Sequence, residues 1–157
     1  IKNSKNRIPY GVDLIQKYRR ESWIVFTENK KQAKEFNKII NTKGFKSALY
    51  NTDLDSGERL ENLNKFKKSD LNVLVTCTAL DEGFDMPEAD GALILSASSS
   101  KRQRVQRMGR VLRITENKPN ALIVTVYSSK TEFDKLMEEA KRYHKEGVPV
   151  SWKRQDR

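Results

Sequence analysis

Three arginines, Arg107, Arg110 and Arg113, follow one another at three-residue spacing in the stretch QRMGRVLR, which begins at Gln106. Positions three apart share one face of a helix, so the three guanidinium groups can converge on one target. Arginine keeps its charge and presents a rigid fork of donors that matches phosphate. Because the stretch contains no acidic residue to neutralise them, we expect an external anion, and a phosphate group is the candidate ligand. The plainer interpretation is a helix face of solvated arginines.

A second stretch, VLVTCTALDEGFDMP (73–87), joins an apolar run to a turn that contains Gly83 and Asp85. Glycine is needed where a Cβ would block the close approach of the backbone to a ligand. This favours a turn that lies against a bound group. The alternative is that Gly83 only permits the turn and that Asp85 caps the local chain.

The elements that must position these stretches alternate between strand and helix. The pattern predicts strands at 23–26, 46–50, 72–76, 92–96 and 121–126, and helices at 11–21, 30–42, 57–67, 102–112 and 131–145. Four of the strands are apolar along their length, which is typical of a parallel sheet covered on both faces. Ligands of such sheets bind beyond the carboxyl ends of the strands. We therefore expect Thr27, the turn 77–85 and the loop 96–101 to share one edge.

Local signals define the ends of two of these helices. Thr27 and Asn29 are the candidate caps of the helix 30–42, and Gly44 ends it. Ser56 is the candidate cap of the helix 57–67, whose expected buried positions are Leu60, Leu63 and Phe66.

Length and composition favour one basic domain. The chain has 157 residues, and 31 Lys and Arg against 21 Asp and Glu give a net charge of +10, which favours a polyanionic partner. Its single Cys excludes an internal disulfide, and no apolar run approaches the roughly 20 residues of a membrane span. We expect a linker at 1–10, a domain at 11–157 and a soluble, intracellular (cytoplasmic) protein. Because the chain begins at Ile1, we also expect it to be a piece of something longer.

Several stretches together carry a resemblance to a known family. QRMGRVLR resembles motif VI of superfamily 2 helicases, VLVTCTALDEGFDMP resembles motif V, and WIVFTENKKQAKEF (23–36) is similar to motif IV. Arg59 stands in the usual place ahead of a helix. The resemblance covers roughly residues 20–130 and implies the second RecA-like lobe, a three-layer α-β-α sandwich with a mainly parallel sheet and no phosphate loop of its own.

The resemblance implies roles for residues of the stretches 106–113 and 73–87. Arg110 and Arg113 would be arginine fingers that reach the γ-phosphate of ATP, with Gln106 beside that phosphate or its attacking water. Gly83 and Asp85 would contact the nucleotide, Asp85 through the ribose or a finger arginine. Arg107 would either contact the nucleotide or have a structural role.

For nucleic acid, the resemblance implies contacts with the phosphate backbone along the sheet edge. The candidates are Thr27, Asn29, Lys30, Thr76, Cys77 and Thr78. Each of them is as readily explained as a helix cap. The family usually has Thr at Cys77 and a His-Gly pair where this chain has Asn51 and Thr52. Glu82 replaces an Arg that is common in its RNA helicases, which favours DNA over RNA.

The chain contains neither a G-x-x-x-x-G-K-[ST] loop nor an acidic Mg²⁺-holding motif after a strand. The resemblance places both on the N-terminal RecA-like lobe of the same polypeptide, which would hold ATP with Mg²⁺. We expect the second motor lobe of an ATP-dependent helicase or translocase that is inactive alone. The alternatives are a free-standing basic nucleic-acid-binding module and a flavodoxin-like small-molecule domain. No metal site is expected in this chain.

Overall fold

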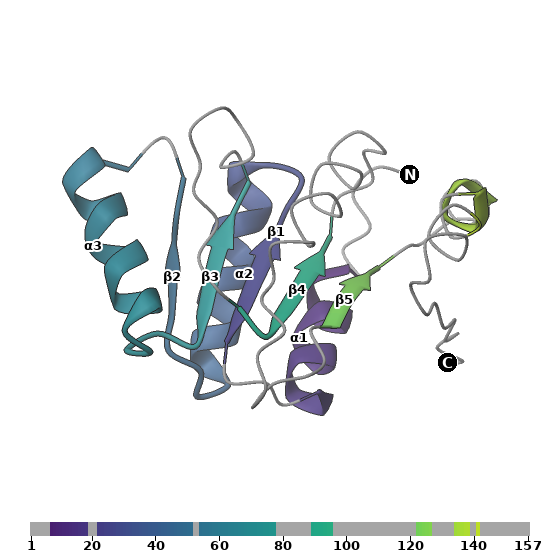
Figure 1. Ribbon diagram of the computed structural model, residues 1–157, viewed down its shortest axis with the longest axis horizontal. Helices are drawn as coiled ribbons and strands as arrows, with labels where there is room; N and C mark the ends of the chain where they lie inside the picture. The colour runs from purple at the N-terminus through teal and green to yellow at the C-terminus, as the bar shows by residue number, and fades with distance from the viewer. Residues whose placement is uncertain are drawn as a thin grey trace.

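The computed structural model describes residues 7–18, 22–51, 54–77, 89–95, 122–126, 134–138 and 141. Helices and strands alternate through most of this part of the chain (Figure 1). The helices are α1 (Arg7–Lys17), α2 (Lys30–Thr42) and α3 (Ser56–Lys67), and the strands are β1 (Trp23–Phe26), β2 (Ser47–Leu49), β3 (Val73–Thr76), β4 (Gly91–Ile94) and β5 (Leu122–Thr125). Residues 134–138 are also helical.

The five strands form one sheet in the order β2-β3-β1-β4-β5, and every neighbouring pair is parallel. The predicted parallel sheet is therefore confirmed, with strand ends that differ from the expected ones by one or two residues. Trp23 lies opposite Val73 on one side and Gly91 on the other, so β1 is the central strand. All five strands end at the same edge, since they run in one direction.

Helices cover both faces of the sheet, which makes the three-layer sandwich (Figure 1). Alternate residues of β1 point to opposite faces: Trp23 and Val25 pack with α1 and α2, whereas Ile24 and Phe26 pack with α3. Because both faces are covered, all four residues of β1, β3 and β4 are buried, which explains their unbroken apolar runs. No helix within the described ranges is long and apolar enough to cross a membrane.

The ends of α2 confirm the sequence signals. Asn29 is the N-cap, and its side chain accepts a hydrogen bond of 2.8 Å from the Gln32 N–H. Gly44 has a φ of +90°, the left-handed conformation that ends a helix and that glycine adopts at little cost.

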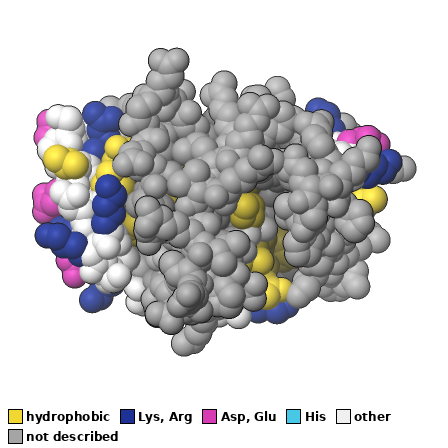
Figure 2. Space-filling view, viewed as in Figure 1, with side chains coloured by type: hydrophobic (Ala, Val, Ile, Leu, Met, Phe, Trp, Pro, Cys, Tyr) yellow, Lys and Arg dark blue, Asp and Glu magenta, His cyan; other side chains and the backbone are white. Residues whose placement is uncertain are grey.

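Two expectations for α3 are wrong. Its N-cap is Asp55, which accepts a hydrogen bond of 3.1 Å from the Gly57 N–H, so Ser56 is the first helical residue. Leu63 and Phe66 are buried as expected, but Leu60 is 58% exposed. Leu60 lies at a shallow surface hollow of about 480 Å³ that Glu61, Asn64 and Lys65 also line. Charged side chains of both signs surround this end of the molecule (Figure 2).

The first helix begins earlier than the sequence indicates. α1 starts at Arg7, so residues 7–10 are helical and are not part of a linker, and the helix ends at Lys17. Pro9 lies in the first helical turn, where an N–H has no intrahelical acceptor. A proline at this position therefore costs no hydrogen bond.

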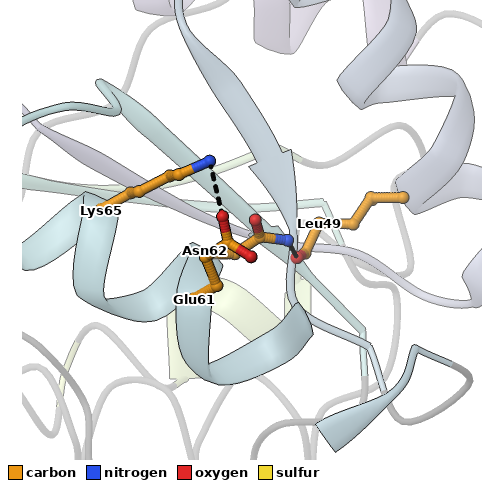
Figure 3. Close-up of polar contacts among 4 residues, drawn as sticks. All are labelled: Leu49, Glu61, Asn62 and Lys65. Carbon is orange, nitrogen blue, oxygen red and sulfur yellow. Dashed lines mark hydrogen bonds and ion pairs between the residues drawn. The ribbon is translucent and has the colours of Figure 1, made fainter. Parts of the chain in front are cut away.

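Asparagine side chains attach β2 to both helical layers. From α2, the Asn41 side chain pairs with the backbone of Ser47, accepting from its N–H at 3.1 Å and donating to its carbonyl at 3.4 Å. Asn37 accepts a hydrogen bond from the Ser47 hydroxyl. From α3, Asn62 donates to the carbonyl of Leu49 at 2.9 Å (Figure 3).

Candidate functional site

The carboxyl edge of the sheet is the place where a ligand would bind. There, β1 is followed by Thr27, β3 by Cys77, β4 by Leu95 and β5 by Val126. From β1 the chain proceeds toward β2, on one side of the sheet, and from β4 it proceeds toward β5, on the other side. The order of the strands therefore changes direction between β1 and β4. In open α/β sheets, ligands bind at the carboxyl edge beside such a point.

The hydroxyl groups of Thr27 and Thr76 bind backbone within this edge. Thr27 is 1% exposed, and its Oγ1 lies 3.2 Å from the carbonyl oxygens of both Asn29 and Thr76. Thr76 is fully buried and donates from Oγ1 to the carbonyl of Tyr50 at 2.6 Å. These two hydroxyl groups therefore join β1, β3 and the residue after β2, and they face the protein interior.

A buried amide joins the ends of β2 and β3. Asn51, which is 1% exposed, accepts a hydrogen bond of 3.2 Å through Oδ1 from the Cys77 N–H. Its Nδ2 is buried and has no hydrogen-bond partner in the part of the chain that the structure describes. The same holds for Nε of Arg59, in the first turn of α3. The connection from β2 to α3 therefore contains two buried donors that lack described acceptors.

The remaining described candidates lie at the start of α2 and the end of β3. Asn29 is exposed and caps α2, so its carboxamide oxygen is already engaged. Lys30 is exposed at the same helix end, and its ammonium group is accessible to solvent. Cys77 is a buried cysteine, 4% exposed. The structure thus brings Thr27, Thr76 and Cys77 together at the edge and leaves Lys30 at its surface.

A buried arginine lies at the other half of the edge. Arg7 is 2% exposed, and its Nη1 is 3.3 Å from the carbonyl oxygens of both Leu95 and Val126. The burial of Arg7 was not expected, because residues 1–10 are predicted to be a linker. Arg7 follows two other cations, Lys2 and Lys5, and nothing in this stretch distinguishes a buried arginine from an exposed one.

The nucleotide candidates Gln106, Arg107, Arg110, Arg113, Gly83 and Asp85 lie outside the described residues, as do Thr78, Glu82 and the predicted helix 102–112. Their roles stay predictions. Within the described ranges, no group of three or more His, Cys, Asp or Glu side chains lies close enough together to hold a metal ion.

The sequence was compared with models of protein families and with known proteins. The model of the helicase conserved C-terminal domain matches residues 6–115, which is most of the chain. The matched range includes α1, all strands but β5, and both stretches that resemble motifs V and VI.

Two relatives show the range of proteins to which the chain is similar. It is 35% identical over 129 residues to the DNA 3'-5' translocase XPB2 of Sulfurisphaera tokodaii, a match that covers 82% of this chain and 28% of the relative. It is 25% identical over 118 residues to the ATP-dependent rRNA helicase RRP3 of Scheffersomyces stipitis, covering 75% of this chain and 24% of the relative. The chain thus spans about a quarter of the length of these relatives.

Among solved structures, the C-terminal domain of S. cerevisiae Dbp5 has the same fold. The TM-score is 0.72 at 20% sequence identity, and the match covers 91% of this chain and 81% of that domain. The sheet and its helical layers are therefore those of a RecA-like helicase C-terminal lobe.

Proposed function

Because the chain belongs to the helicase conserved C-terminal domain family of superfamily 2, we propose that it is the second motor lobe of an ATP-dependent helicase or translocase. The observation that supports this most directly is the family match over residues 6–115. The sheet is parallel, and ligands of such sheets bind at the carboxyl ends of the strands. In this function the lobe completes a nucleotide site between two lobes. ATP is the substrate, and closure of the two lobes around it moves this lobe along a nucleic-acid strand.

The catalytic groups of this proposal are Gln106, Arg110 and Arg113. Arg110 and Arg113 place positive charge where the γ-phosphoryl group develops negative charge as its bond breaks. Gln106 orients the phosphate or the attacking water. Gly83, Asp85 and Arg107 contact the nucleotide or hold the arginines in place.

ATP with Mg²⁺ is held mainly by the first RecA-like lobe of the same polypeptide in this proposal. The sequence of this chain contains no phosphate loop, so it has neither the backbone cradle nor the lysine that bind the phosphates in such lobes. This chain then supplies positive charge and shape, and it does not hydrolyse ATP on its own.

The nucleic-acid contacts of this proposal lie along the carboxyl edge. Lys30 supplies an exposed charge, while Thr27 and Thr76 shape the edge through their backbone-bound hydroxyl groups. The net charge of +10 supports binding of a polyanion in general.

DNA is favoured over RNA as the strand that this motor follows. The relative that is 35% identical is a DNA translocase, whereas the rRNA helicase is 25% identical. Glu82 also replaces the arginine that the RNA helicases of the family often carry at this position. Stimulation of ATPase activity by single-stranded DNA and by RNA of the same length, compared at one salt concentration, tests this preference.

The decisive experiment is a nucleic-acid-stimulated ATPase assay on the two-lobed polypeptide that contains this chain. Arg110→Ala and Arg113→Ala should each lower kcat by about 10³-fold or more while nucleotide binding is largely kept, because an arginine finger acts mainly in the transition state. Lys38→Ala removes one charge from an exposed position in the middle of α2 and is the matched control.

Unchanged turnover in both arginine variants would contradict the proposal. The basic binding module would then be the better interpretation, since such a module binds nucleic acid without any need for these arginines. A polypeptide without ATPase activity that still binds single-stranded DNA would lead to the same conclusion.

A further inference from the structure

β2 is an edge strand, and within the described residues it pairs with β3 alone. Lys46, just before β2, accepts a hydrogen bond of 3.1 Å from the first residue of β3, and Tyr50, just after β2, donates to β3 at 2.8 Å. The backbone groups of successive residues in a strand point to opposite sides of that strand. The N–H and carbonyl groups of Ser47 and Leu49 therefore point away from β3, toward the outer edge of the sheet.

Side-chain amides bind three of these four outward backbone groups. Asn41 accepts from the Ser47 N–H at 3.1 Å and donates to the Ser47 carbonyl at 3.4 Å. Asn62 donates to the Leu49 carbonyl at 2.9 Å (Figure 3). A carboxamide has the donor and the acceptor of a peptide group, so Asn41 binds Ser47 as a residue of a neighbouring antiparallel strand would.

The two asparagines reach the edge from helices on opposite faces of the sheet. Asn41 follows the buried Ile40 of α2, and Asn62 precedes the buried Leu63 of α3. The two core clusters thus hold the helices from which these carboxamides extend. Asn41 is itself exposed, so burial of its side chain does not explain its place. What both amides do is bind backbone groups that another strand would need.

We propose that Asn41 and Asn62 close the β2 edge against the addition of a strand from a second copy of this chain. An open edge is a template for pairing with another chain. Two copies related by a twofold axis would bring their β2 strands together antiparallel and join their sheets into one. The inference concerns association between copies, so it does not depend on the function proposed above.

Replacing both asparagines by alanine removes the amides without adding a large apolar side chain. For the double variant Asn41→Ala and Asn62→Ala, we expect the average mass of the two-lobed polypeptide to rise with concentration toward twice that of the wild type. Analytical ultracentrifugation measures this mass. Amide hydrogen exchange locates the contact: the Ser47 N–H should exchange faster than in the wild type at low concentration, and the Ser47 and Leu49 N–H groups should both become protected as the mass rises.

Two controls separate an opened edge from a loss of stability. The double variant Asn41→Asp and Asn62→Asp also removes both amide donors, but it places carboxylates at the edge, where those of two copies repel each other. Leu63→Ala lowers stability by removing a buried side chain beside Asn62 and leaves both edge asparagines in place. Both controls should keep the mass of the wild type. All variants are measured at a temperature where circular dichroism shows each to be folded.

The proposal is overturned if the alanine variant keeps the wild-type mass at the highest concentration, or if its mass rises without protection of Ser47 and Leu49. It is also overturned if either control associates as strongly as the alanine variant, because association would then follow from lost stability and not from an open edge. None of these readouts measures ATP turnover, so either result leaves the function proposed above as it stands.

Discussion

β2 and β5 are both edge strands of the same parallel sheet, and within the described residues each pairs with a strand on one side only. β2 is attached to its surroundings by neutral hydrogen bonds with three asparagines on two helices, Asn37, Asn41 and Asn62. β5 is fastened at its end by one buried cation, Arg7, through the carbonyl of Val126. An edge strand has backbone groups that no neighbouring strand pairs with. Asparagine side chains bind such groups at β2, and an arginine side chain binds one at the end of β5.

The difference concerns how the stabilisation is distributed. Each neutral bond at β2 contributes about 1 kcal/mol, and the loss of one leaves the others in place. At β5 a single guanidinium group serves two carbonyl groups, so its removal affects both at once. Among the described residues, the β2 edge should therefore tolerate substitution at any one position, whereas the end of β5 should depend on Arg7.

Arg7→Met should have the largest effect on stability. Two buried carbonyl groups lose a charged donor, so we expect the free energy of unfolding to fall by about 3 kcal/mol. Urea denaturation of the chain, followed by circular dichroism, measures this change. Lys17→Met, on the exposed face of the same helix, makes the same change of charge and should stay within about 0.5 kcal/mol of the wild type.

An equal, small effect of Arg7→Met and Lys17→Met would remove the distinction between the two edges. It would mean that the buried guanidinium group contributes no more than a solvated lysine, because the cost of its desolvation cancels the two hydrogen bonds.

The layers of the fold could be predicted from the sequence, while the attachment of its edges could not. Buried parallel strands are apolar along their length, so the apolar runs 23–26 and 73–76 could be predicted as strands. The cap of α2 at Asn29 and its end at Gly44 also follow from local chemistry. Arg7, Asn51 and Asn62 gave no such signal, since a polar residue that bonds to a distant backbone group has the same local sequence as one in water.

The candidate site shows the same division. Thr27 and Thr76 were correctly expected near one edge, because both follow or end parallel strands. Their hydroxyl groups point to the carbonyl groups of neighbouring strands, a detail that depends on the strand order. Leu60 is a further example: helical spacing made it a core residue, but α3 buries a narrower face, and only Leu63 and Phe66 are buried.

Asn62→Leu tests the distributed edge and should have an intermediate effect. The Leu49 carbonyl loses a donor at 2.9 Å, and we expect the free energy of unfolding to fall by about 1 kcal/mol. Asn64→Leu makes the same substitution at an exposed position of α3 and is the control. A loss in Asn62→Leu as large as that in Arg7→Met would show that β2 also depends on a single contact.

The pair Glu61 and Lys65 should have the smallest effect, although it flanks Asn62 on the same helix (Figure 3). The Lys65 Nζ lies 3.2 Å from the Glu61 Oε1, but the two side chains are 65% and 48% exposed, for Glu61 and Lys65 respectively. Water and salt screen such a pair, so a double-mutant cycle with Glu61→Gln and Lys65→Met should give a coupling of about 0.3–0.5 kcal/mol. That coupling should shrink as the salt concentration rises, whereas the effect of Asn62→Leu should not, because its hydrogen bond is neutral and partly buried. If both responded to salt alike, the Asn62 contact would be as solvated as the ion pair, and β2 would lack the helix attachment on which the contrast with β5 depends.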